Sequence, residues 1–267
     1  MELVLLKLVL TPTLIGAASL AGRRWGAFIG GWLIALPLTS GPVTFFLALD
    51  QGPRFAASVA AGSLLGVMAI AAFALAYGRL ARRGWPVAVA GAAATFAVVG
   101  FIAQPLVPLP VAVPLVLVLA SLVGASRGLP QAARGEVVPA APAWEIPGRM
   151  VIGTAVVLAL TAVADALGPG LSGVVAIFPT FAAILTAFTH RREGAAQAVA
   201  VLRGLLTGLY GTAGFFVILI VALPPLGVGP GFALALGGSL ALQGAAMLAL
   251  RRPGGQRARA TSSMTAR

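Results

Sequence analysis

The sequence contains no cysteine, a single histidine and very few charged residues. Without cysteine, the chain has no disulfide, no thiolate metal ligand and no cysteine nucleophile. Because His190 is the only histidine, a metal site or catalytic dyad built on two histidines is excluded as well. Only 9% of the 267 residues are charged and 60% are hydrophobic, against about 25% and about 45–50% in soluble globular proteins. This composition excludes a soluble enzyme, a DNA-binding protein and a disordered chain, and predicts an integral membrane protein.

Nine apolar stretches are long enough to cross a bilayer, which takes about 20 residues in a helix. They cover residues 3–22, 26–49, 55–78, 85–103, 106–125, 149–166, 168–190, 196–222 and 231–250. Two longer runs without charge are divided at prolines, the first at Pro105–Pro108 and the second at Pro224–Pro225. The predicted fold class is all-α, a polytopic bundle of about nine transmembrane helices.

The formal net charge of +12 is distributed unevenly over the connections between these stretches. With nine spans, nearly all basic residues fall on one side of the membrane, and the other side holds Arg54 and little else. The residues on the basic side are Arg23, Arg24, Arg79, Arg82, Arg83, Arg127, Arg134, Arg149, Arg191, Arg192, Arg251, Arg252, Arg257, Arg259 and Arg267. Since basic residues gather in cytoplasmic loops, we expect the N-terminus outside and the C-terminus in the cytoplasm. The same distribution accounts for the positive charge without a nucleic-acid partner.

The chain resembles itself at an offset of 142 residues. The matches that shared composition explains least are the pairs Pro37/Pro179, Thr44/Thr186, Phe46/Phe188 and Phe73/Phe215. Each repeat then contains four spans, and the fifth span lies between them. One extra crossing turns the second repeat upside down relative to the first, an arrangement common in secondary transporters.

This reading divides the chain into four parts. They are a first four-helix repeat (1–104), a linking transmembrane helix with a cytoplasmic linker (105–148), a second four-helix repeat (149–250) and a basic cytoplasmic tail expected to be mobile (251–267).

A pattern of residues in the second half points to a known family. It consists of Arg149 at the start of a span, the run Ser172–Phe181, the triplet Arg192–Gly194, and Leu202-Arg203 in the next helix. In these features residues 149–221 resemble the GlpM-like family of small bacterial inner-membrane proteins, whose members are single four-helix units. The first repeat departs from the pattern, with Leu36–Thr39 in place of Phe178–Phe181 and Ala61 in place of Arg203.

The resemblance implies a location in the bacterial cytoplasmic (inner) membrane and a link to envelope polysaccharide or glycerol metabolism. It supplies no mechanism. A fused duplication of one small unit is also what the internal repeat suggests.

Pro37 and Pro179 lie near the middle of their predicted spans. Proline removes a backbone hydrogen bond and frees a carbonyl group, which in lipid needs a partner or a cavity. Paired interruptions at matching places of two repeats are typical of a transport site. The predicted substrate-binding residues are Pro37, Thr39, Ser40, Thr44, Pro179, Thr180, Thr186 and Arg203. The alternative is that each proline only bends a packed helix whose carbonyls are satisfied locally.

Arg203 is the only arginine well inside an apolar stretch, about two turns from its start. An ionisable residue at this depth is a functional hypothesis, here either binding of an anionic group or pairing with a freed carbonyl. The alternative is a side chain that extends to the cytoplasmic interface. His190, next to Arg191 and Arg192, is expected at the surface.

Two functions remain open. The first is a small-solute transporter or channel-like protein whose partners are the lipid bilayer and a small polar or anionic solute. The second is a non-transporting scaffold or regulatory subunit of an envelope polysaccharide or glycerol-metabolism pathway. An enzyme is not expected, since there are no paired carboxylates and no histidine- or cysteine-based site. No cofactor or metal is expected, and a homo-oligomer is compatible with either function.

Overall fold

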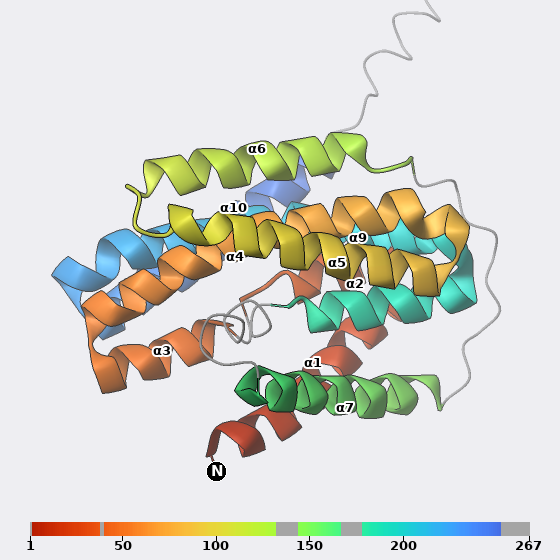
Figure 1. Cartoon of the computed structure of the whole chain (residues 1–267), viewed down its shortest axis with the longest axis horizontal. Coiled ribbons are helices and arrows are strands. Elements are labelled where there is room, and N and C mark those ends of the chain that lie inside the picture. Colours follow the sequence, from red (N-terminus) through yellow and green to blue (C-terminus); the bar gives the residue numbers. More distant parts are fainter. Residues whose placement is uncertain (1, 38–39, 132–143, 167–177, 252–267) are drawn as a thin grey trace, which may run out of the picture.

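The computed structural model describes residues 2–37, 40–131, 144–166 and 178–251 (Figure 1). Thr39 and residues 252–267 of the predicted tail lie outside these ranges. Every element in the described part is helical, which confirms the all-α prediction. The helices are α1 (Glu2–Trp25), α2 (Ala27–Ile34), α3 (Ser40–Gln51), α4 (Pro53–Leu80), α5 (Trp85–Ala103), α6 (Ala112–Gly128), α7 (Glu145–Ala166), α9 (Thr180–Leu226) and α10 (Val228–Arg251).

Within the described ranges, four stretches of helix are long and apolar enough to cross a membrane. They are Pro53–Arg83, Trp85–Leu106, Thr180–Leu226 and Val228–Leu248. Length and composition therefore identify these helices as candidate spans of an integral membrane protein. Helix α6 is apolar but shorter.

Sharp turns between consecutive helices are made by glycines with positive φ. Within the described ranges these are Gly26, Gly52, Gly84, Gly194 and Gly227, with φ between 78° and 98°. Glycine has no Cβ and adopts this conformation without a steric penalty, so one helix can follow another directly. Gly194 divides α9 into a first segment (180–193) and a second segment (195–226).

The predicted span 26–49 is not one helix. Helix α2 ends at Ile34 and α3 begins at Ser40, because Pro37 lacks an N–H and disfavours helical geometry in the residue before it. Helix α7 begins at Glu145, four residues earlier than the predicted start of the sixth span at Arg149. The linker therefore ends sooner than the sequence suggests.

Helix α9 lies at the centre of the bundle, in contact with α1, α2, α4, α5, α6, α7 and α10. Helices α6 and α7 lie at opposite edges, and α7 packs against α1 (Figure 1). The large side chains of Phe73, Tyr77 and Phe215 are fully buried in the core. Helix α2 approaches the second segment of α9 so closely that a methyl group on Gly204 would overlap the carbonyl of Phe28.

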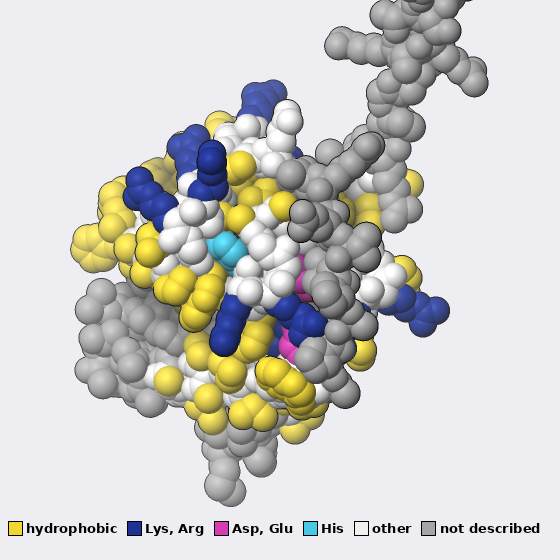
Figure 2. All heavy atoms as spheres, turned by 90° about the vertical axis from the view of Figure 1, so that its right-hand side faces the viewer, with side chains coloured by type: hydrophobic (Ala, Val, Ile, Leu, Met, Phe, Trp, Pro, Cys, Tyr) yellow, Lys and Arg dark blue, Asp and Glu magenta, His cyan; other side chains and the backbone are white. Residues whose placement is uncertain are grey.

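The turns that carry arginine lie together at one end of the molecule. This end, at the right of Figure 1, holds the α4–α5 turn, the turn within α9 and the start of α7. Viewed from there, Figure 2 shows Lys and Arg side chains spread around the histidine. We call it the basic end; its arginines include Arg23, Arg24, Arg79, Arg82, Arg83, Arg127, Arg191 and Arg192. The α3–α4 turn, the α5–α6 connection and the α9–α10 turn lie at the opposite end.

Candidate functional site at the break in α2

The break after α2 ends the regular helical bonding near Ala35, and polar side chains from other helices bind two carbonyls there. The carbonyl of Trp32 also accepts the backbone amide of Ala35 at 3.3 Å. The Thr212 hydroxyl, on the second segment of α9, donates to the carbonyl of Ala35. The Gln243 side-chain amide, on α10, donates to the carbonyl of Trp32 at 3.2 Å. Both polar side chains are buried, at 7% and 1% exposure. These bonds supply the partners that freed carbonyls need away from water.

The second predicted proline break, at Pro179, lies directly before the first segment of α9. The amide of Thr180 donates to the carbonyl of Phe178 at 2.7 Å, so Pro179 lies in a tight turn. The ring of Phe178 packs edge-on against Phe73 of α4 and Phe96 of α5, with centroids 6.0 and 5.5 Å away. The residues before Phe178 lie outside the described ranges. Aromatic packing of Phe178 therefore stabilises the part of this break that lies within the described ranges.

The predicted hydroxyl residues differ in their bonding. Thr44 donates to the Ser40 carbonyl at 2.8 Å within α3, as a threonine in a membrane helix commonly does. Thr186 is fully buried, and its hydroxyl has no hydrogen-bond partner in the described part of the chain. It therefore remains the strongest candidate among the predicted residues for a polar contact with a solute.

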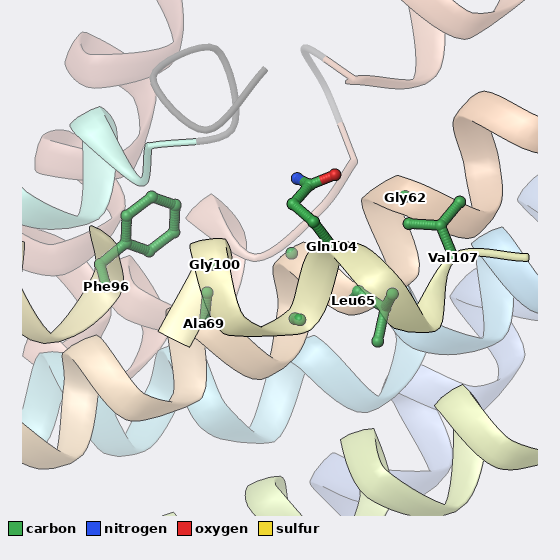
Figure 3. A pocket seen from close by; sticks show the side chains of 9 residues that line it. Gly62, Leu65, Ala69, Phe96, Gly100, Gln104 and Val107 are labelled. Carbon is green, nitrogen blue, oxygen red and sulfur yellow. The ribbon is translucent and has the colours of Figure 1, made fainter. Parts of the chain in front are cut away.

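A small cavity lies between α4 and α5, beside Phe96 (Figure 3). Gly62, Leu65, Ala69, Gln104 and Val107 also line it, and its volume is about 20 Å³. A cavity of this size has room for about one water molecule. In Figure 3 the Gln104 amide is the polar group at its rim.

Arg203 binds backbone carbonyls that follow the end of α6. Its Nη2 donates to the carbonyls of Leu129 and Pro130, at 3.2 and 2.9 Å, where α6 has just ended. The sequence offers pairing with a freed carbonyl as one alternative; the carbonyls bound here follow the C-terminus of α6 and are not those of the breaks at Pro37 or Pro179. The contact is favourable because a cation binds the unpaired carbonyls at a helix C-terminus.

A charged cluster at the basic end involves residues that were not predicted as a site. Glu145, 3% exposed at the start of α7, forms ion pairs with Arg23 at 3.2 Å, with Arg192 at 2.6 Å and with Arg149. The cluster joins the end of α1, the start of α7 and the turn within α9. Glu193 lies close by in that turn; burial raises the pKa of its carboxyl, and the Arg149 guanidinium opposes the shift.

The spacing of Glu145 and Arg149 is a signal that sequence reasoning could have used, since residues four apart on a helix face each other. The Glu145 pairings to α1 and α9 are not visible in the sequence.

The expectation for His190 is wrong. Its side chain is 8% exposed, and its Nδ1 lies 3.2 Å from the hydroxyl of Tyr77 on α4. The imidazole is therefore part of the packing between α4 and the first segment of α9. Within the described residues no group of three His, Asp or Glu side chains gathers to bind a metal ion.

Most of the predicted site residues have separate partners. Thr44 bonds within α3, Pro179 and Thr180 lie beside α4 and α5, and Arg203 binds the end of α6. The structure instead brings the end of α2 together with Thr212 and Gln243, and neither of these side chains is among the predicted substrate-binding residues.

Comparison with models of protein families, with curated proteins and with solved structures finds no match to this chain.

Proposed function

We propose that the chain is a multi-pass protein of the bacterial cytoplasmic membrane, related to the GlpM-like family and built from two inverted repeats. The turn glycines support this proposal, because Gly52 and Gly194 stand 142 residues apart and Gly84 and Gly227 stand 143 apart, all with positive φ. The α3–α4 turn and the turn within α9 lie at opposite ends of the molecule (Figure 1). Equivalent turns at opposite ends are what one inverted repeat requires.

We propose further that this protein transports a small polar or anionic solute across the membrane. The observation that carries the proposal is the interruption of α2, whose carbonyls are exposed to polar side chains in the middle of an apolar bundle. Interrupted helices supply such backbone groups to solutes in many transporters. Within the described ranges, the predicted contacts are Pro37, Ser40 and Thr44 from one repeat, and Pro179, Thr180, Thr186 and Arg203 from the other.

Flux into proteoliposomes tests this proposal. We suggest glycerol as the neutral probe, followed by light scattering, and radiolabelled inorganic phosphate as the anionic probe. Thr186→Val is expected to abolish flux of the accepted probe. The matched control is Thr154→Val, which removes a hydroxyl that only bonds to Met150 in its own helix. Equal flux through both variants would contradict the assigned site.

The second candidate, a non-transporting scaffold, is favoured by a different observation. The carbonyls at the end of α2 already accept hydrogen bonds from protein donors, and the cavity beside Phe96 has room for only about one water molecule. A scaffold predicts no flux of either probe and a partner that co-purifies from membranes. Flux of either probe that depends on Thr186 would exclude this candidate.

A further inference from the structure

An open groove of about 1010 Å³ lies between α2, α6, the second segment of α9 and α10. Its lining residues include neither Pro37 nor Pro179. Its lining is mainly apolar and aromatic, and includes Trp25, Trp32, Ser126, Arg203, Tyr210 and Met247. A groove of this size can hold part of a long amphiphilic molecule.

The charge of the groove has one sign. Among the described residues, Arg203 is the only charged one that lines it, and none of the described lining residues is a carboxylate. Its two hydrogen bonds to carbonyls both use Nη2, while the buried Nε has no acceptor within the described part of the protein. The buried indole N–H of Trp32 likewise has no acceptor there. Two donors without acceptors and an uncompensated guanidinium favour an anionic, oxygen-rich group.

The groove also lies at the level where lipid headgroups are expected. Trp25, which is 63% exposed at its edge, follows Arg23 and Arg24 of the basic end. The Arg24 guanidinium lies 5.6 Å from the centre of the Trp25 ring. Tryptophan and arginine together are typical of the membrane–water interface, and basic clusters there attract anionic lipids.

We propose that this groove binds an anionic phospholipid, with its phosphate at Arg203 and an acyl chain along the apolar floor formed by Phe28, Ile29 and Leu206. A phospholipid fits better than a free anion because the lining is mostly apolar and the groove is open along its length. Because Arg203 is also a predicted substrate-binding residue, the experiment below measures lipid preference directly and does not depend on transport.

Quenching of tryptophan fluorescence by brominated lipids tests the proposal. The chain has four tryptophans, so Trp25, Trp85 and Trp144 are replaced by Phe to leave Trp32 as the reporter. The full-length protein is reconstituted in phosphatidylcholine vesicles that contain a small fixed fraction of brominated phosphatidylglycerol or of brominated phosphatidylcholine. We expect the anionic lipid to quench Trp32 at about fivefold lower mole fraction. Equal quenching by the two lipids would overturn the proposal.

Substitutions and a competing anion then test whether Arg203 is the residue that causes the preference for the anionic lipid. Arg203→Gln is expected to remove the preference for phosphatidylglycerol, and Arg203→Lys to keep most of it. The control Arg127→Gln removes an exposed arginine of α6 at the same end and should leave the preference unchanged. If Arg203→Gln fails to fold, loss of the preference in the folded Arg203→Lys chain would count against the phosphate contact. If added inorganic phosphate relieves the quenching, the site binds a soluble anion and the lipid assignment is wrong.

Discussion

The hydroxyl of Thr212 donates a hydrogen bond to the main-chain carbonyl of Ala35, a residue 177 positions earlier in the chain. The carbonyl is free because α2 ends one residue before it and Pro37 cannot continue the helix. The bond therefore ties the break in α2 to the central helix α9. In the proposed two-repeat arrangement, the bond also joins the first repeat to the second.

Thr212→Val keeps the shape of the side chain and removes this donor. The carbonyl of Ala35 is then left buried without a partner, which should lower the free energy of unfolding by about 0.5–2 kcal/mol. Thermal unfolding in detergent measures the change. Thr154→Val, whose hydroxyl bonds within its own helix, should have a smaller effect. An equal loss of stability in the two variants would show that the interhelical bond stabilises the protein no more than a bond within one helix.

Glu145→Gln is expected to destabilise the protein more than any change at Thr212. Three arginines share the Glu145 carboxylate, and Arg149 among them is 4% exposed. Leaving such a charge buried without its partner costs about 3–5 kcal/mol. A drop in the unfolding temperature measured by intrinsic fluorescence tests this. Unchanged unfolding would mean that the arginines find other partners.

Glu193→Gln is the matched change in the same cluster, and its effect should depend on pH. Burial raises the pKa of the Glu193 carboxyl, so the folded chain binds this proton more tightly than the unfolded chain does. The stabilisation from this group is present below the usual pKa of glutamate and is lost as pH rises through the raised value. Glu193→Gln should therefore gain stability relative to the unmodified chain as the pH increases. A constant difference across that range would contradict the assignment.

Gly204→Ala should disrupt the packing of α2 on α9. The added methyl group overlaps the carbonyl of Phe28, which is main chain and cannot rotate away. Overpacking of this kind costs about 1–3 kcal/mol. Gly237→Ala on α10, where nothing lies within 4 Å, is the control and should be neutral or slightly stabilising. Equal unfolding temperatures for the two variants would contradict the close approach.

Some of this structure could be predicted from the sequence, because it depends on local properties. The apolar stretches predict the helices, and the missing N–H of Pro37 predicts an interruption in the second span. The contacts of His190 and Glu145 could not be predicted in the same way. His190 is buried through Tyr77, which lies 113 positions away, and Glu145 is held by Arg23, which lies 122 positions away. A single sequence does not reveal pairings over such distances. The polar neighbours of His190 therefore suggest a surface position, and the partners of Glu145 on α1 and α9 stay hidden.

If two equivalent units cross the membrane in opposite directions, their matching turns face opposite sides of it, and single-cysteine labelling shows the side of each turn. The chain has no cysteine, so Gln51→Cys and Arg191→Cys each introduce one thiol next to an equivalent turn, at Gly52 and Gly194. Both positions are exposed. With a membrane-impermeant maleimide, we expect labelling of position 51 in intact cells. Position 191 should be labelled only after the membrane is permeabilised, which gives the reagent access to the cytoplasmic side. Labelling of both positions from the same side would contradict the opposite orientation of the two units.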